Sequence, residues 1–193
     1  MELLILRHGE TPWTISGQHT GSTEVNLTEV GRQQAQAQGD VIAEILRGRE
    51  PLVLVSPRRR TRDTAALALP DVAHVIVEEL TEFDYGDYEG LTTEQIQSGR
   101  AGWSIWDDGC PGGETVADVA ARVDVTLGQL SSEHRPIVAV THGHTSRILA
   151  ARSLGLDGVM GAILDTTAGS LSVLGPHHER MTIKLWNQAP PLH

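Results

Sequence analysis

Three short apolar runs in this sequence each end in basic or imidazole side chains, and this repeated pattern constrains the fold more than any other feature. The runs and the residues that follow them are 3–6 with Arg7-His8-Gly9, 52–55 with Ser56-Pro57 and Arg58-Arg59-Arg60, and 137–140 with Thr141-His142-Gly143. Apolar runs of this length that stop at turn residues are typical of buried strands. Ligands of an open α/β sheet bind just beyond the carboxyl ends of its strands. If the three strands are parallel, their polar ends therefore meet at one edge of one sheet.

The segments between these runs have helical spacing or turn composition. Helices are predicted at 27–48, from Ser56-Pro57 through about 69, at 92–97, at 115–134 and at 146–154, and further strands at 72–77, 170–174 and 181–186. Loops are predicted after the first strand and over the acidic stretch 78–90, with a turn over 175–179. Strands that alternate with helices predict the α/β class. We expect residues 1–193 to form one domain, a three-layer α/β/α sandwich with a mostly parallel central sheet.

Composition excludes several classes of function. A chain of 193 residues with 39% hydrophobic residues is long enough to bury one substantial core. The formal net charge of -10 argues against a general affinity for nucleic acid or for anionic membranes. Cys110 is the only cysteine, so no internal disulfide can form. The sequence has neither a signal-peptide pattern nor an apolar stretch of about 18 residues, which predicts a cytoplasmic protein. A homodimer that pairs through an edge strand near the C-terminus is left open.

The converging cations predict a binding site for an anion. Like charges that are packed together in a partly buried pocket repel one another unless an anion joins them. Tetrahedral phosphate suits the planar guanidinium groups of Arg7 and Arg60, which donate hydrogen bonds in pairs. The competing interpretation is that 58–62 is a solvated helix start and that His8 and His142 are structural. Two His-Gly strand ends together with an arginine cluster favour the phosphate site.

An ordered set of short motifs along nearly the whole chain resembles the histidine phosphatase superfamily, which includes the cofactor-dependent phosphoglycerate mutases. The matching residues are Leu6–Thr11, Leu27-Thr28, Gly31, Gln34-Ala35, Ser56, Arg60, Thr64-Ala65, Glu82, Tyr85-Gly86, Glu89-Gly90, Gly113-Glu114-Thr115, Arg122, His142-Gly143 and Arg147. The resemblance implies a phosphoglycerate mutase-like fold and a phosphoryl-transfer reaction.

The resemblance also assigns catalytic roles to five residues. His8 matches the family's nucleophile, which forms a phosphohistidine, and a neutral imidazole is suited to that step. Arg7, Arg60 and His142 match the residues that hold the phosphoryl oxygens and stabilise the developing charge. Glu82 matches the general acid, and at neutral pH this role needs a pKa above the usual value of about 4.3. By sequence alone the acidic stretch around Glu82 is more typical of a solvated loop, and only the motif distinguishes Glu82 from Asp84.

We expect further contacts with phosphate or substrate from two segments. These residues are Thr14, Gln18, Thr20 and Gly21 in the first loop, and Gly143 and His144 after the 137–140 strand. Thr14 stands where the family usually has Asn, and Gln18 where it often has Arg, so the pocket loses a charge but keeps hydrogen-bonding groups. The stretches 16–21, 85–90 and 106–110 are most similar to a branch that contains broad acid phosphatases and sedoheptulose-bisphosphatase-like enzymes.

The group that accepts the phosphoryl separates phosphatases from mutases in this family. Mutases usually carry a longer insert after the Glu-Gly pair, with paired basic residues that grip the substrate carboxylate. Here the stretch 103–110 is short and contains Asp107 and Asp108, which would repel a carboxylate. We therefore expect hydrolysis of a small phosphorylated metabolite, such as a sugar phosphate, with inorganic phosphate as the product. A cofactor-dependent phosphoglycerate mutase is the alternative.

Other interpretations stay open. A non-catalytic regulatory module that binds phosphate would account for Thr14 and Gln18, although the retained motif residues argue against it. A metal site would use His142-x-His144 or His177-His178, but neither spacing matches a zinc signature, so we expect no metal and no cofactor. The aromatic residues Trp103, Trp106 and Tyr88 either wall the leaving-group side of the pocket or belong to the core.

Overall fold

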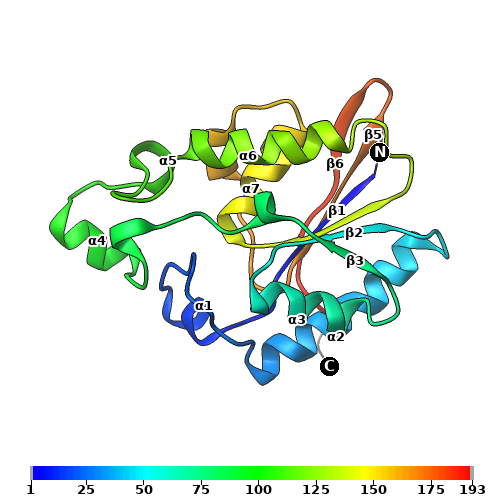
Figure 1. Cartoon of the computed structure of the whole chain (residues 1–193), viewed down its shortest axis with the longest axis horizontal. Helices are drawn as coiled ribbons and strands as arrows, with labels where there is room; N and C mark the ends of the chain where they lie inside the picture. Colours follow the sequence, from blue (N-terminus) through cyan, green and yellow to red (C-terminus); the bar gives the residue numbers. More distant parts are fainter. Residues whose placement is uncertain (1, 192–193) are drawn as a thin grey trace.

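The structure, a computed structural model, describes residues 2–191 and contains one six-stranded sheet (Figure 1). Its strands are β1 (Leu3–Arg7), β2 (Leu52–Val55), β3 (His74–Ile76), β4 (Ile137–Thr141), β5 (Leu171–His177) and β6 (Arg180–Gln188), in the spatial order β3-β2-β4-β1-β5-β6. The first four strands are mutually parallel, whereas β5 and β6 are antiparallel to their neighbours. The predicted mostly parallel sheet with a closing antiparallel pair is confirmed.

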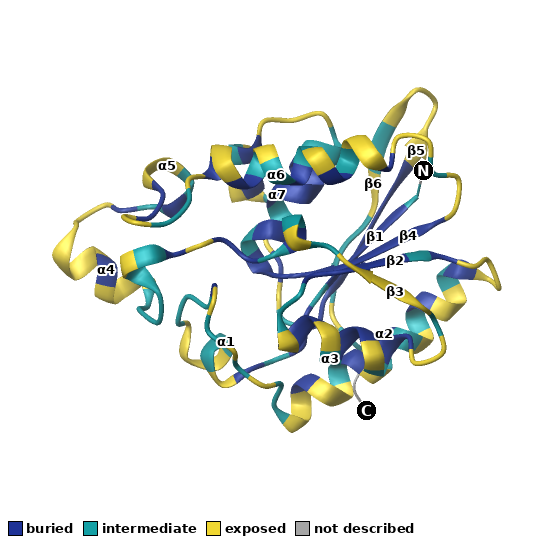
Figure 2. Ribbon diagram, in the orientation of Figure 1, coloured by how far each residue is buried: buried dark blue, intermediate teal, exposed yellow. Residues whose placement is uncertain are grey.

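Helices cover both faces of this sheet and complete the predicted three layers (Figures 1 and 2). On one face lie α2 (Glu29–Leu46) and α3 (Arg59–Ala68), and on the other lie α6 (Val116–Gln129) and α7 (Gly143–Ser153). Side chains of a strand alternate between the two faces. On β1, Leu4 and Leu6 belong to the core on the α2 and α3 side, and Leu3 and Ile5 to the core on the α6 and α7 side.

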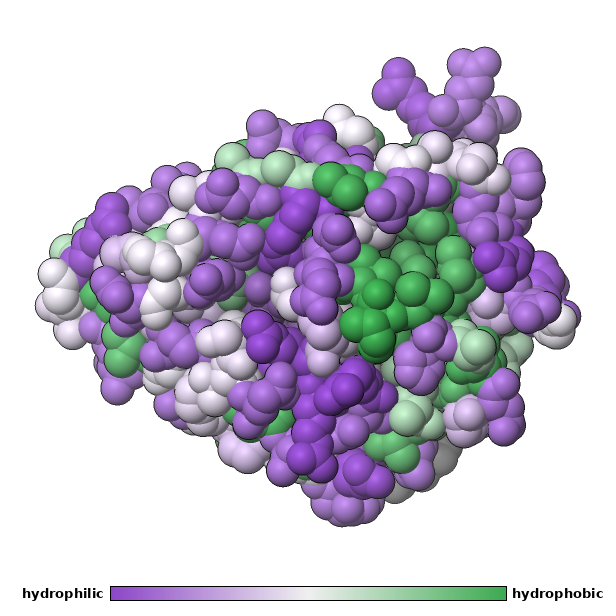
Figure 3. Space-filling model, viewed as in Figure 1, coloured by the Kyte–Doolittle hydropathy of each residue, from purple (hydrophilic) through white to green (hydrophobic). Residues whose placement is uncertain are grey.

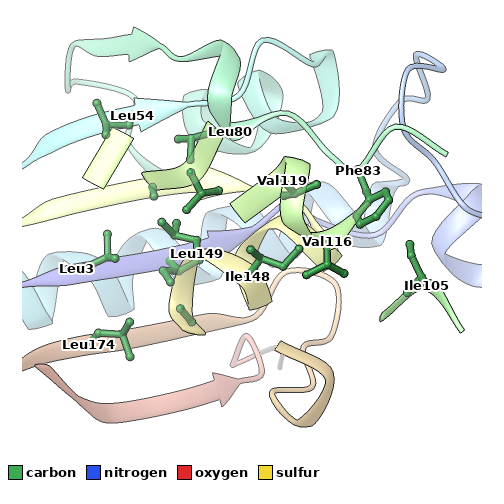
Figure 4. Close-up of a cluster of buried hydrophobic side chains, with 14 of the residues drawn as sticks. Leu3, Leu54, Leu80, Phe83, Ile105, Val116, Val119, Ile148, Leu149 and Leu174 are labelled. Carbon is green, nitrogen blue, oxygen red and sulfur yellow. The ribbon is translucent and has the colours of Figure 1, made fainter. Parts of the chain in front are cut away.

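The larger core lies on the α6 and α7 side of the sheet (Figure 4). Val116, Val119 and Val123 recur at helical spacing on α6, and each is at most 8% exposed. Ile148 and Leu149 of α7 are buried in the same cluster. Each fully buried side chain of this size contributes about 1.5–3 kcal/mol relative to its exposed state. This packing fixes the start of α7, and with it His142 and His144, against the parallel strands.

Short elements surround the sheet edge at which the parallel strands end. They are α1 (Pro12–Ser16), α4 (Thr93–Gly99) and α5 (Ile105–Asp108), with the 3₁₀ helices η1 (Glu78–Leu80), η2 (Gly86–Tyr88) and η3 (Gly158–Ile163). The sequence predicts loop at α1, but Thr11 and Thr14 form a reciprocal capping box and Pro12 occupies the first turn. These local signals stabilise one and a half turns that apolar periodicity alone does not reveal.

Two helices begin at other residues than predicted, because side-chain hydrogen bonds to distant parts of the chain decide where they start. Ser56 was expected to cap α3, but its hydroxyl lies 2.7 Å from His142 Nε2, and the helix begins at Arg59 without a side-chain cap. The last predicted helix begins three residues earlier than expected, at Gly143, because the Glu82 carboxylate accepts hydrogen bonds from its first turn. The turn between β5 and β6 is also tighter than predicted and places His178 at φ +54°.

The edge strand β3 leaves apolar surface exposed. Val75 is 52% exposed and Ile76 45% exposed, and Figure 3 shows an apolar area over β2 and β3. A shallow cavity of about 300 Å³ beside these strands is lined mainly by aliphatic side chains. Among the helices of residues 2–191, none is long and apolar enough to cross a membrane.

Candidate active site

The three predicted strand ends meet at one edge of the sheet. The amide of His8, just after β1, donates to the carbonyl of Thr141 on β4 at 3.0 Å. The amide of Ser56, just after β2, donates to the carbonyl of Val140 at 3.1 Å. Because β1 and β2 flank β4 in parallel, their polar ends converge as the sequence predicts.

A cavity of about 210 Å³ opens at this edge. Eight of the predicted site residues line it: Arg7, His8, Thr14, Gln18, Thr20, Glu82, Gly143 and His144. The predicted residues Arg60, His142 and Gly21 do not line it. Sequence reasoning missed Trp13, Asp165 and Thr166 as lining residues. It had placed four further lining residues only within motifs, namely Gly17, His19, Tyr85 and Arg147. Asp165 and Thr166 lie in the segment before β5, where the sequence carries no recognisable motif.

The structure holds His8 as a neutral imidazole with one free nitrogen. His8 is 4% exposed, and its Nδ1 lies 2.8 Å from the carbonyl oxygen of Gly9, so Nδ1 carries the proton and donates it. Burial, followed by the positive charges of Arg60 and Arg7, lowers the pKa of His8 to about 3. The unprotonated Nε2 therefore keeps its lone pair at physiological pH.

Arg7 supplies a guanidinium group that is only partly satisfied by the protein. Its Nη1 donates to the carbonyl of Thr166 at 2.6 Å, which fixes the side chain in the cavity wall. Its Nε is buried without a hydrogen-bond partner among residues 2–191. A buried unpaired donor costs about 1–3 kcal/mol, and more when it is charged. Its Nη2, in contrast, has no hydrogen-bond partner among residues 2–191 and is not sealed off, so an anion in the cavity can accept a hydrogen bond from Nη2.

Arg60 and His142 lie one layer behind the cavity wall. Arg60 is fully buried, and its Nη atoms donate to the carbonyls of Thr20, Gly21 and Thr23. Its Nε donates to Nδ1 of His142 at 3.2 Å. The proton of neutral His142 is thus on Nε2, which donates to Ser56, and its ring centroid lies 5.3 Å from that of His8. In this structure Arg60 acts on His8 through its charge, and the neutral His142 packs beside the His8 ring, but neither residue lines the cavity.

Glu82 differs from the sequence-based expectation in its ionisation. Its carboxylate accepts hydrogen bonds from the amides of Phe83, His144 and Thr145, at 2.9, 3.2 and 3.0 Å, and from the Thr145 hydroxyl. Burial alone would raise the pKa of Glu82, but His144, two of these amides and Arg60 outweigh it and lower the pKa. The pKa of Glu82 is thus lowered where a raised value was expected, because the carboxylate caps the N-terminus of α7.

The first-loop residues are positioned by the protein itself. The Thr14 hydroxyl takes part in the capping box of α1, and the Gln18 amide donates to the carbonyl of Gly90 at 2.8 Å. The Thr20 hydroxyl donates to the carbonyl of Gln18. The Gly21 amide donates to both carboxylate oxygens of Glu89, at 3.1 and 2.9 Å. This segment is therefore held over the cavity by contacts with 89–92.

Aromatic side chains and one ion pair form the outer wall. The His19 ring stacks on Tyr85 with centroids 4.7 Å apart. Arg147 lies over the Trp106 ring at 4.5 Å, and its Nη1 is 3.9 Å from a carboxylate oxygen of Asp165. Trp103 is a core residue, 2% exposed, and its indole N–H donates to the carbonyl of Gly109. Trp106 supports Arg147 from outside the lining.

Two further sequence-based arguments can be compared with the structure. Asp107 and Asp108 lie on α5 outside the cavity lining, and Asp108 pairs with Arg100. Neither aspartate is therefore placed to contact a substrate carboxylate directly, and the structure does not support that argument against a mutase. Within residues 2–191 there is no group of three or more His, Cys, Asp or Glu side chains placed to hold a metal ion.

Comparison with known proteins settles the family. A model of the histidine phosphatase superfamily (branch 1) matches residues 3–189. The chain belongs to this superfamily. It is 45% identical over 179 residues to an acid phosphatase of Mycobacterium tuberculosis, a match that covers 91% of this chain and 87% of the relative. It is 32% identical to the sedoheptulose 1,7-bisphosphatase of Saccharomyces cerevisiae, over 79% of this chain and 67% of the relative.

Solved structures agree with these relatives. The structure of a functionally characterised open reading frame of Mycobacterium tuberculosis superposes on this chain with a TM-score of 0.91, at 41% identity over 98% of both chains. The histidine phosphatase fold, the phosphatase class and the resemblance to the branch with acid phosphatase and sedoheptulose-bisphosphatase relatives are confirmed.

Proposed function

We propose that this histidine phosphatase hydrolyses phosphomonoesters of small metabolites through a phosphohistidine formed on His8. The observation that carries the proposal is the state of His8: a neutral imidazole, oriented by Gly9, with a free Nε2 in a cavity that is also lined by Arg7, whose Nη2 has no partner among residues 2–191. A nucleophile that faces a phosphate needs a lone pair and a nearby cation. Both are in place before substrate binds.

In the first half-reaction His8 Nε2 attacks phosphorus, the N–P bond forms and the ester P–O bond breaks. Arg7 donates to the phosphoryl oxygens, while the charge of Arg60 and the neutral His142 ring lie close behind. Glu82 protonates the leaving alkoxide. The protein's own groups lower the pKa of Glu82, and we propose that the dianionic phosphoryl group raises it, because a like charge disfavours the ionised carboxylate.

In the second half-reaction water attacks the phosphohistidine. Glu82, now a carboxylate, accepts a proton from that water as the new O–P bond forms and the N–P bond breaks. Inorganic phosphate leaves, and His8 returns to its neutral form. We propose that five further lining residues contact the phosphate or the rest of the substrate: Thr14, Gln18, Thr20, Gly143 and His144. Gly21 shapes the loop through Glu89.

Replacement of His8 tests the proposal. His8→Ala is expected to abolish turnover of phenyl phosphate, while His134→Ala, at an exposed position remote from the cavity lining, keeps wild-type kcat/KM. Activity is expected to survive exhaustive chelation. A His8→Ala variant with substantial turnover, or a chelated enzyme that regains activity only with zinc, would contradict the proposal.

We propose small sugar phosphates or related polyol phosphates as the substrate class. A cavity of about 210 Å³ admits a small metabolite, and the relatives named above include a sugar bisphosphatase. A panel of sugar phosphates, phosphoglycerates and phosphoamino acids, scored by kcat/KM, tests this class. A phosphoglycerate assay primed with bisphosphoglycerate tests the mutase alternative, and we expect no interconversion. Tight phosphate binding without hydrolysis of any ester would favour the regulatory module.

We also propose a cytoplasmic location and keep the homodimer as a prediction. The sheet has two edge strands, β6 and β3, and the Val75 and Ile76 side chains of β3 are exposed. Light scattering of the purified chain measures the molar mass, and a value of twice 20.8 kDa would support a dimer. Fractionation of the producing cells tests the location.

A further inference from the structure

His144 lies in the first turn of α7, and its ring lines the same cavity as His8. The ring Nδ1 lies 2.7 Å from the hydroxyl oxygen of Tyr85. The other ring nitrogen, Nε2, has no hydrogen-bond partner among residues 2–191 and is not sealed off from the cavity. His144 thus has one ring nitrogen bound to the protein and one that is free to meet a ligand.

Both members of the Tyr85–His144 hydrogen bond are electrically neutral. Burial raises the pKa of Tyr85 well above its ordinary value, and the nearby Glu82 carboxylate adds to this effect. Burial lowers the pKa of His144 to about 3, although Glu82 opposes the shift. The phenol is therefore protonated and the imidazole neutral. Because the Tyr85 hydroxyl has no other acceptor among residues 2–191, we assign it as the donor to Nδ1, which places the proton of His144 on Nε2.

The neighbours of His144 keep its ring in one orientation. Its centroid lies 5.4 Å from that of Trp106, 6.0 Å from that of His19 and 6.2 Å from that of Phe83. The backbone amide of His144 donates to Glu82 Oε2 at 3.2 Å. Because Glu82 is the proposed proton donor to the ester oxygen, this contact places His144 on the leaving-group side of the cavity.

We propose that Tyr85 is a positioning residue that holds His144 with its Nε2–H directed at an oxygen in the alcohol part of the substrate. This inference rests on the proposed phosphatase function and adds a determinant of specificity to it. An alcohol part with hydroxyl groups offers an acceptor to Nε2–H, whereas a phenyl group offers none beyond the ester oxygen. The Tyr85–His144 pair therefore favours polyol phosphates over aryl phosphates.

The chain contains two tyrosines, which gives a matched pair of variants. Tyr85→Phe removes only the hydroxyl that bonds Nδ1. Tyr88→Phe is the control, because Tyr88 packs edge-on against Trp103 and does not line the cavity. With ribose 5-phosphate and phenyl phosphate as substrates, we expect Tyr85→Phe to lower the ratio of their kcat/KM values about 10-fold. Tyr88→Phe is expected to leave the ratio unchanged.

A second measurement reads the position of the proton directly. In the wild-type chain, ¹⁵N NMR of His144 is expected to show a protonated Nε2 and a bare Nδ1, and Tyr85→Phe is expected to give a mixture of both tautomers. A protonated Nδ1 in the wild type would overturn the inference, as would a Tyr85→Phe variant that slows both substrates equally or neither. Failure of the wild type to hydrolyse phenyl phosphate would instead count against the proposed function, and the tautomer measurement would still decide the inference.

Discussion

At the scale of single residues, the fold sets the protonation state of each reacting group. The site residues His8 and Glu82 could be predicted from the sequence because short motifs mark them. Their ionisation could not, because it depends on partners far away in the chain. The Glu82 carboxylate meets the first turn of α7, about sixty residues later, and that contact lowers its pKa. For the same reason the sequence could not show that Arg60 and His142 bond each other behind the lining.

Replacement of Glu82 separates an acid role from a purely structural one. Glu82→Gln is expected to lower kcat on alkyl phosphates about 10²–10⁴-fold, because a poor leaving group needs the proton. The loss on nitrophenyl phosphate is expected to be much smaller, since that leaving group departs without protonation. Asp84→Asn is the control, because Asp84 belongs to the same acidic stretch but does not line the cavity. Equal losses on both substrates would argue against proton donation.

At the scale of elements, apolar periodicity predicted the strands and the long helices, whereas contacts between chain segments decide where the short elements begin. β1, β2 and β4 lie where their apolar runs predict, because each run is buried on both faces. Ser56 and Pro57 carry a helix-start signal that the buried hydrogen bond to His142 overrides. The wall formed by Asp165 and Thr166 was not predictable, because it is held by the distant side chains of Trp186 and Arg7.

The junction between β1 and α2 offers a test at this scale. A methyl group on Gly9 would overlap the carbonyl oxygen of Gly31. This oxygen belongs to the backbone and has little room to move. Gly9→Ala is therefore expected to destabilise the fold by about 1–3 kcal/mol and to displace His8. Gly128→Ala, in α6 with open space around it, is expected to be neutral or stabilising. Urea unfolding measures both, and a Gly9→Ala variant as stable as wild type would contradict the packing argument.

At the scale of the whole molecule, the buried neutral histidines tie stability to pH. His8 and His144 each have a pKa of about 3 in the fold, against about 6.5 in the unfolded chain. Between these values the unfolded chain binds more protons, so the free energy of unfolding falls as the pH decreases from 6.5 towards 3. The Glu82 carboxylate adds to this loss below pH 4.5, since its pKa is also lowered.

The contribution of one histidine to this pH dependence can be measured from the slope of the free energy of unfolding against pH. Each buried histidine contributes up to about 1.4 kcal/mol per pH unit to the dependence of stability on pH within this range. The variant His8→Asn is expected to show a shallower slope than wild type between pH 6 and pH 4, measured by urea unfolding at several pH values. His134→Asn, at an exposed position, is expected to leave the slope unchanged. Identical slopes for wild type and His8→Asn would show that His8 is not kept neutral by the fold.

The proposed phosphohistidine on His8 is tested most directly by rapid quenching of the enzyme during turnover of ³²P-labelled substrate, followed by peptide mapping. We predict stoichiometric label that is stable in alkali, labile in acid and located on the peptide that contains His8, with no label on the His8→Ala variant. Label on any other residue, or full turnover without a labelled enzyme at the shortest quench times, would contradict the account.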